Sequence, residues 1–399
     1  MKTICLFSFL MTLLSCSAGA FTDLEPTAFE AKSADAQVAT LDVRTAEEYA
    51  AGHLPWASNC DWYAEDFIDK VAADYPKGTA LAIYCRTGRR SSEAAAKLSG
   101  AGYTVYNLKG GIEAWTAAGK AVTTYAAETF FTDGGAPLTI ALIKHGTLAL
   151  RYKGLTLHVD PVGAYGKATD YAKEFPKADV ILVTHEHGDH FDKDAIAALT
   201  EDGWTELVTN ARCASMLGYG KAMANGDRLT LPGDIVLDAV PAYNYTEGHT
   251  QFHPKGRDNG FVLTADGLRI YIAGDTEDIP EMSELKDIDV AFLPVNQPYT
   301  MTVEQCMKAT KLISPKVLIP YHFSRTDLSA LPEMLPGTDV RLRDMQWRLV
   351  LLSDSESGAE GGPGIVTGED LEITGFLTCA HVRAAERAEL GRDGEFHGT

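Results

Sequence analysis

Three histidines and an aspartate crowd into one short stretch near the middle of the chain. The stretch runs from Thr184 to His190 with the sequence THEHGDH, and it directly follows the apolar run 180–183. An apolar run rich in β-branched residues is typical of a buried strand, so these histidines leave a rigid element. On a turn, His185 and His187 can converge on one ion, while Asp189 and His190 point to a second position beside it. Imidazole with carboxylate and without thiolate favours zinc, manganese or iron with open coordination positions, which indicates chemistry rather than structural support.

Two later apolar runs end in the same kind of side chain. Asp275 follows the run 268–272, and His322 follows the run 317–321. Open sheets present ligands at the carboxyl ends of their strands, so both residues follow runs at whose ends a ligand can be placed.

The THEHGDH stretch resembles the first metal motif, H-x-H-x-D-H, of the metallo-β-lactamase fold family. That resemblance implies an α/β domain built as an αββα sandwich, with two divalent metal ions that hold a hydroxide between them. Zinc is the first expectation for the ions, with manganese or iron as alternatives. The implied metal ligands are His185, His187 and an intervening histidine at the first ion and Asp189, His190 and His322 at the second, with Asp275 bridging. Asp189 is also expected to shuttle the proton in catalysis.

The intervening ligand is either His249 or His253. His253 precedes Pro-Lys-Gly and an expected strand, which hold its backbone on both sides, whereas His249 lies in a polar loop. We therefore expect His253 to be the ligand. His145 and Asp160 end strands on the same expected edge, so they are expected to support the ligands, although plain burial explains His145 equally well. His158 is expected to be structural.

Motifs around the ligands resemble the branch that contains ascorbate-phosphate lactonase-like hydrolases. The matching segments are 143–146, 159–161, 252–256, 259–260, 273–276 and 319–322. The resemblance implies hydrolysis of a small-molecule ester, lactone or phosphodiester.

A second reactive group lies earlier, in the loop from Cys85 to Ser91. The runs 38–44 and 80–84 read as buried strands and 91–98 as a helix, an alternation that predicts a parallel α/β sheet. A tight loop running into a helix N-terminus, with three arginines nearby, favours the Cys85 thiolate as a nucleophile.

This region resembles the rhodanese (sulfurtransferase) domain in residues 41–44, 48–49, 52–55, 85–91 and 110–115. The resemblance implies that Cys85 takes sulfur from a sulfane-sulfur donor as a persulfide and passes it to a thiol acceptor. The sulfur-binding loop would comprise Arg86, Thr87, Gly88, Arg89 and Arg90. Asp42 and Arg44 are expected to buttress the loop, and Glu48 and His53 to shape its surface. A rhodanese fold without activity is the alternative.

The 399 residues divide into five expected segments. Residues 1–20 carry a short apolar core and match a secretion signal, with either an A-x-A cleavage site at 18–20 or a lipobox at Cys16. The rest divides into a rhodanese-like domain at 24–122, a linker at 123–137, a hydrolase domain at 138–353 and an expected disordered tail at 354–399. The protein is thus expected to be exported, periplasmic or lipid-anchored to a bacterial envelope, with membrane contact only through that anchor.

The formal net charge of -20 argues against nucleic acid as a partner. Five cysteines would remain after the signal, and their spacing indicates no disulfide framework.

The sequence thus predicts an exported metal-dependent hydrolase joined to a Cys-persulfide sulfurtransferase module. One alternative is an iron persulfide dioxygenase, which also joins this fold to rhodanese domains and needs only two histidines and one carboxylate at its iron. The other is a non-catalytic metal- or thiol-binding surface protein.

Overall fold

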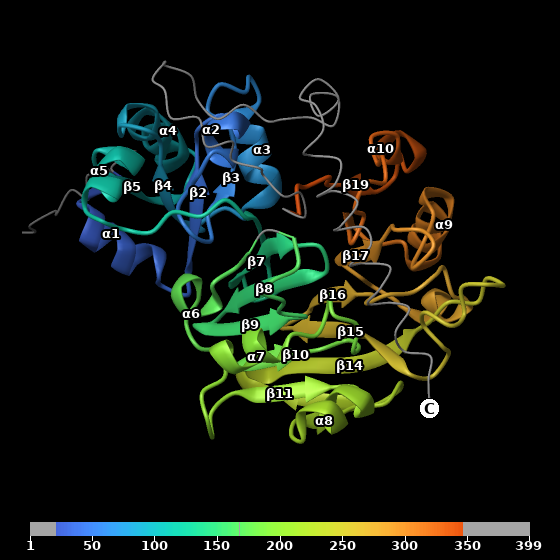
Figure 1. Cartoon of the computed structure of the whole chain (residues 1–399). Coiled ribbons are helices and arrows are strands. Elements are labelled where there is room, and N and C mark those ends of the chain that lie inside the picture. Colours follow the sequence, from blue (N-terminus) through green and yellow to red (C-terminus); the bar gives the residue numbers. More distant parts are fainter. Residues whose placement is uncertain (1–20, 167, 346–399) are drawn as a thin grey trace, which may run out of the picture. The chain divides into compact units, whose positions relative to one another are not determined.

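The protein is described by a computed structural model that covers residues 21–166 and 168–345 (Figure 1). The chain divides into two compact units, with the main boundary between Val122 and Thr123. Within the described ranges, no helix has the length and apolar character needed to cross a bilayer. The expected signal and C-terminal tail lie outside the described residues.

The first unit is an α/β domain around a five-stranded sheet of order β1-β5-β4-β2-β3. The pairings β1 to β5, β5 to β4 and β4 to β2 are parallel, which confirms the predicted parallel sheet. Its strands are β1 (Thr22–Leu24), β2 (Val38–Asp42), β3 (Ser58–Asn59), β4 (Ala80–Tyr84) and β5 (Thr104–Leu108). Its helices are α1 (Pro26–Ser33), α2 (Ala46–Ala50), α3 (Phe67–Asp74), α4 (Arg89–Gly100) and α5 (Gly111–Ala117).

The second unit contains two seven-stranded sheets. The first sheet consists, in chain order, of β6 (Ala126–Phe131), β7 (Pro137–Lys144), β8 (Thr147–Tyr152), β9 (Leu155–Val159), β10 (Val180–Leu182), β11 (Glu206–Thr209) and β12 (Lys221–Ala222). The second consists of β13 (Arg228–Leu231), β14 (Ile235–Ala242), β15 (Asp258–Ala265), β16 (Leu268–Ile272), β17 (Val290–Pro294), β18 (Val317–Tyr321) and β19 (Asp339–Val340). The α-helices of this unit are α6 (Tyr171–Glu174), α7 (Lys193–Leu199), α8 (Ala211–Leu217), α9 (Val303–Ile313) and α10 (Leu331–Met334), and the 3-10 helices are η1 (Pro232–Asp234) and η2 (Pro280–Glu284).

Period-two alternation along the strands fills three apolar layers. Leu138, Ile140 and Leu142 of β7 join a core that also contains Phe261 and Leu263 of β15, so this core lies between the sheets. Alternate residues of β7 pack instead into a cluster with α6, α7 and α8. Alternate residues of the second sheet pack likewise with η2, α9 and α10. Since successive side chains of a strand point to opposite faces, each sheet is covered on both sides, which confirms the predicted αββα sandwich.

The segment expected to be a linker, residues 123–137, instead supplies a strand, and that expectation is wrong. Residues Ala126–Phe131 form β6, which pairs antiparallel with β7 and leaves Ala127 buried. Small and polar residues around the strand suggested a loop. The threonine and phenylalanines of β6 suit a pleated surface, and pairing with β7 provides the surface to fit.

Candidate metal centre

The THEHGDH turn follows β10, in the parallel part of the first sheet, where β10 lies between β9 and β11. Asp160, which directly follows β9, anchors the turn. Its carboxylate accepts hydrogen bonds from the backbone N–H and the hydroxyl of Thr184, both at 2.7 Å. Because neighbouring parallel strands end at the same edge, Asp160 reaches the start of the turn and orders it.

Two groups of potential metal ligands lie at this edge, and within each group the candidate ligand atoms lie within 4.8 Å of one another. The first group contains His185, His187, His253 and Asp275. The second contains His145, Asp189, His190 and His322. The structure therefore brings together all seven residues that the sequence singled out as ligands, and it adds His145.

Asp275 lies between the two groups. Its Oδ2 is 3.4 Å from His253 Nε2 and 3.8 Å from His185 Nε2 in the first group. On the other side, Oδ2 is 3.2 Å from His322 Nε2, and Oδ1 is 3.3 Å from His190 Nε2. Two ligands bound at about 2.1 Å with angles near 90–110° lie about 3–3.5 Å apart. Three of the four distances fall in this range, and the fourth, from His185, is slightly longer at 3.8 Å. The donor atoms are therefore arranged to face shared ions, with Asp275 in the bridging position.

Buried atoms without partners provide a test of whether ions fit here. Among the described residues, the Nε2 atoms of His185, His190 and His322 and the Oδ1 of Asp275 are buried and have no hydrogen-bond partner. Leaving such atoms unpaired costs about 1–3 kcal/mol each. Divalent cations at the centre would satisfy all four, so the residues present fit a two-ion site.

The outer ring nitrogens of three histidines are held in place. His190 Nδ1 lies 2.8 Å from Asp160 Oδ2, His253 Nδ1 lies 3.0 Å from Asp258 Oδ2, and His185 Nδ1 lies 2.9 Å from the Thr184 hydroxyl. A partner at Nδ1 fixes the ring and directs Nε2 toward the centre, as at protein metal sites in general.

Electrostatics favours the ligand form of most of these groups. Burial, helped by neighbouring histidines, lowers the pKa of His187 and of His145 to about 4, so both are neutral at pH 7. Burial also opposes charge on His322, but the carboxylates of Asp275 and Asp189 outweigh it and raise the pKa of His322 to about 9. A cation at this place would compete with that proton for the same carboxylates.

The two candidates for the intervening ligand lie in different places. His253 belongs to the first ligand group, whereas His249 lies outside both groups with its Nδ1 3.3 Å from Glu277 Oε1. His145 forms the turn between β7 and β8, and its Nε2 lies 3.2 Å from Asp189 Oδ2. The sequence left its role open, because a histidine in a hairpin turn has no partner that spacing alone can reveal. His158, by contrast, is buried against the rings of Tyr171 and Phe175.

In the first unit, Cys85 directly follows β4, and its loop runs into α4. Cys85 is buried, and the Ser91 hydroxyl lies 3.5 Å from its sulfur. The carbonyl of Cys85 accepts a hydrogen bond from the N–H of Ile112 at 2.9 Å. At Gly111 a Cβ would meet that carbonyl at 2.4 Å, so only glycine lets α5 approach the loop so closely.

The surroundings of the Cys85 loop are charged. Glu48 holds Arg90 through two contacts of 2.7 Å, and Arg44 lies against Asp42 at 2.7 Å in a buried pair. Of the other loop residues, Arg86, Thr87 and Arg89 are exposed and Gly88 is buried. The expectation that His53 shapes the surface is wrong. His53 is fully buried and stacks on Tyr49 at 3.7 Å, a partner four residues away that the loop spacing did not reveal.

Comparison with known proteins supports both domains. Residues 139–322 match the family model of the beta-lactamase superfamily domain, and residues 25–118 match the rhodanese-like domain. A UPF0173 metal-dependent hydrolase of Staphylothermus marinus is 36% identical over 174 residues, which are 42% of this chain and 72% of the relative. One of Shouchella clausii is 30% identical over 192 residues, which are 45% of this chain and 83% of the relative.

A crystal structure of a Parabacteroides distasonis protein, named as a metal-dependent hydrolase, is 52% identical. It aligns with a TM-score of 0.53 and covers 55% of this chain and 99% of the other. The histidine and aspartate groups, the αββα sandwich and these relatives agree. The chain therefore belongs to the metal-dependent hydrolases of the beta-lactamase superfamily and carries a rhodanese-like domain before its hydrolase domain.

Proposed function

We propose that the second unit hydrolyses an ester, a lactone or a phosphodiester of a small molecule with two divalent ions. One ion would be held by His185, His187 and His253 and the other by Asp189, His190 and His322. The observation that carries the proposal is Asp275, whose carboxylate lies within 3.2–3.8 Å of four imidazole nitrogens from both groups.

Ions bound there would polarise the scissile carbonyl or phosphoryl group and lower the pKa of a water molecule toward about 7. Asp189 is suited to move the proton. Burial raises the pKa of its carboxyl group, but His190, His145 and His322 outweigh burial and hold that pKa well below its usual range. Asp189 is therefore ionised at neutral pH, which is the form needed to take a proton from that water molecule and pass it to the leaving group.

Metal analysis tests this proposal. Gently purified protein should carry close to two equivalents of transition metal, zinc first and manganese or iron otherwise, and Asp275→Ala should lose both because its carboxylate faces both groups. Asp238→Ala serves as the control, since Asp238 pairs with Arg228 at an exposed position. Protein that binds no metal would end the proposal. A loss of only one ion in Asp275→Ala would remove the bridging role.

We further propose that Cys85 transfers sulfur. Its thiolate would attack the outer sulfur of thiosulfate, forming the Cys85 persulfide as the donor S–S bond breaks and sulfite leaves with the electron pair. A thiol acceptor would then take that sulfur. The Ser91 hydroxyl, 3.5 Å from the Cys85 sulfur, and a loop that carries three arginines support this proposal.

Variants at Cys85 separate the two chemistries. Cys85→Ser should abolish transfer from thiosulfate and leave hydrolysis of model lactones or phosphodiesters nearly unchanged. Cys60→Ser is the matched control, because burial raises the pKa of Cys60 to about 11 and keeps it a thiol. Oxygen uptake with a low-molecular-weight persulfide on iron-loaded protein, yielding sulfite without any hydrolysis, would instead favour a persulfide dioxygenase.

Export is a separate part of the proposal and rests on the sequence of residues 1–20. Fractionation of cells expressing the full chain should place it in the periplasm or envelope, and Cys16→Ala should release it from the membrane if Cys16 carries a lipid. Recovery of the full chain in the cytoplasm would contradict export.

A further inference from the structure

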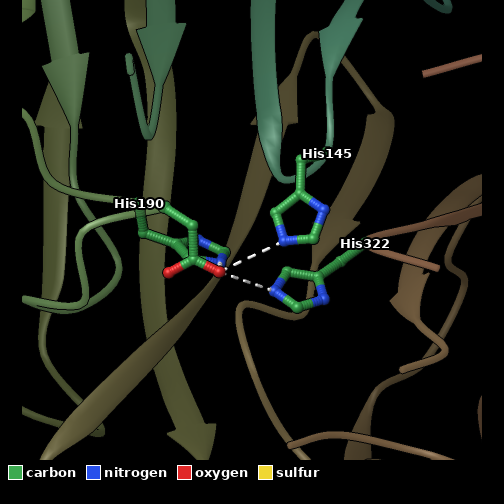
Figure 2. A group of neighbouring side chains, drawn as sticks. His145, His190 and His322 are labelled. Carbon is green, nitrogen blue, oxygen red and sulfur yellow. Dashed lines mark hydrogen bonds and ion pairs between the residues drawn. The ribbon is translucent and has the colours of Figure 1, made fainter. Parts of the chain in front are cut away.

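The second ligand group contains one histidine more than the family motif supplies. The motif provides Asp189, His190 and His322, but His145 lies with them and offers its Nε2 to the same space. Figure 2 shows the rings of His145 and His322 aimed at one carboxylate oxygen, which belongs to Asp189. The two distances, 3.2 Å for His145 and 3.3 Å for His322, are nearly equal.

The backbone fixes His145 in this position. Its N–H donates to the carbonyl of Met345 at 3.0 Å, and its carbonyl accepts from the N–H of His322 at 3.1 Å. The β7–β8 turn is thereby tied to the end of β18, and the two imidazole rings lie 3.6 Å apart. Both residues have positive φ, 44° at His145 and 48° at His322. This conformation costs an ordinary residue about 1–2 kcal/mol, and such strain is kept where it serves a site.

His145 also resembles His322 in its surroundings. Both are 1% exposed, and the Nδ1 of each is buried without a hydrogen-bond partner among the described residues. The Nε2 of His145 lies as close to Asp189 Oδ2 as does the Nε2 of His322, which the motif makes a ligand. The position of Nε2 relative to Asp189 matches that of a second donor around one ion.

We propose that His145 is a ligand of the second metal ion, which would then have four protein ligands of its own besides the bridging Asp275. The first ion would have three, His185, His187 and His253. The inference rests on the proposed two-ion function. It makes the second site the more crowded one, so that with a shared water-derived ligand this ion would approach six-coordinate geometry. At the second site, manganese or iron, which are the alternatives to zinc in the proposed function, would then suit better than zinc.

The test uses metal-free full-length protein titrated with Co²⁺, whose visible absorption is weak when six-coordinate and strong when tetrahedral. Wild-type protein should bind two equivalents. His145→Ala should still bind the first equivalent, but its affinity for the second should fall by roughly 100-fold or more. This loss is larger than the one expected when only a supporting contact is removed. The absorption of the second equivalent should also rise. His249 pairs with a carboxylate but lies outside both ligand groups, so it provides the control. His249→Ala should change neither the affinity for the second equivalent nor its absorption.

His145→Gln separates a ligand from a supporting residue. The substituted side chain would place an amide N–H where Nε2 stood, so it can still donate to Asp189 but is a poor ligand. If His145 binds the ion, the His145→Gln variant behaves like the His145→Ala variant. If His145→Gln binds two equivalents with wild-type affinity and spectrum, His145 only supports Asp189 and the inference is overturned.

Two further outcomes are distinguishable. Wild-type protein that binds fewer than two ions would contradict the proposed function itself, independently of His145. Should His145→Ala fail to fold, His145→Asn, whose side chain tolerates positive φ, provides the same loss of Nε2. Unchanged second-site affinity in that variant would also overturn the inference.

Discussion

At the residue scale, the centre is built from side chains whose outer atoms are fixed and whose inner atoms are left unpaired. His253 shows the pattern. Its Nδ1 lies 3.0 Å from buried Asp258, and its Nε2 lies 3.4 Å from Asp275. Asp258 is held in turn by Arg257, which also lies 3.4 Å from Glu186 beside the ligands His185 and His187. In this series of contacts each carboxylate faces a cationic or imidazole group, so the position of the His253 ring is well defined.

His253→Ala should therefore impair both metal binding and hydrolysis by roughly 100-fold or more, since it removes a ligand and leaves Asp258 without its imidazole partner. His249→Ala should have little effect on either, because His249 contacts Glu277 and belongs to neither ligand group. Measured dissociation constants for the first ion, with hydrolysis rates at saturating metal, check the ranking. The reverse order would show that His249 is the ligand.

At the scale of elements, the site depends on how closely the β7–β8 turn approaches the THEHGDH turn. Gly146 makes this approach possible. A Cβ at Gly146 would lie 2.5 Å from Cε1 and 3.0 Å from Nδ1 of His190. Its φ is not in the left-handed region, so a side chain there is excluded by the His190 ring and not by the backbone.

Gly146→Ala should displace the His190 ring and destabilise the second unit by about 1–3 kcal/mol. It should also lower the affinity for the second metal ion more than the affinity for the first. Urea unfolding combined with metal titration measures both effects. Gly337→Ala is the control in the same unit, since nothing lies within 4 Å of its Cβ position and its φ is not positive. If the Gly146→Ala variant bound the second ion with unchanged affinity, the two turns would be free to separate.

At the scale of the whole molecule, a buried histidine away from the metal centre makes stability depend on pH. His158 is fully buried, neither ring nitrogen has a partner among the described residues, and burial lowers its pKa to about 3. In the unfolded chain its pKa is about 6.5. Above pH 6.5 the ring is neutral in both states. Below it, the unfolded chain binds a proton that the folded unit excludes, so stability falls as pH falls toward 3.

Replacing His158 should remove this sensitivity. Relative to wild type, His158→Leu should gain about 2 kcal/mol in free energy of unfolding between pH 7 and pH 5. Metal-free protein is used, so that the ligand histidines contribute equally to both proteins and cancel in the difference. A difference between the two proteins that stays constant over this range would contradict a neutral buried His158.

The sequence by itself determined the two domain types, the αββα sandwich and the residues that gather at the metal centre. It could do so because ligands that follow buried strands must meet at the carboxyl edge of a sheet, whatever the details of packing. His185 and His187 were therefore predictable from their spacing after an apolar run. Asp275 was found through the family resemblance, and the apolar run before it agreed. The Cys85 loop was also predictable, because an apolar run before it and a helical pattern after it mark a turn between a strand and a helix.

Only the tertiary structure decided the features that depend on neighbours distant in sequence. His145 approaches Asp189, 44 positions away, because β7 and β18 end side by side, and no local pattern encodes that pairing. The segment Ala126–Phe131 became a strand because β7 offered it an edge, although its own residues suggested a linker. Each of these outcomes is a matter of tertiary contact, which can override weak local preferences.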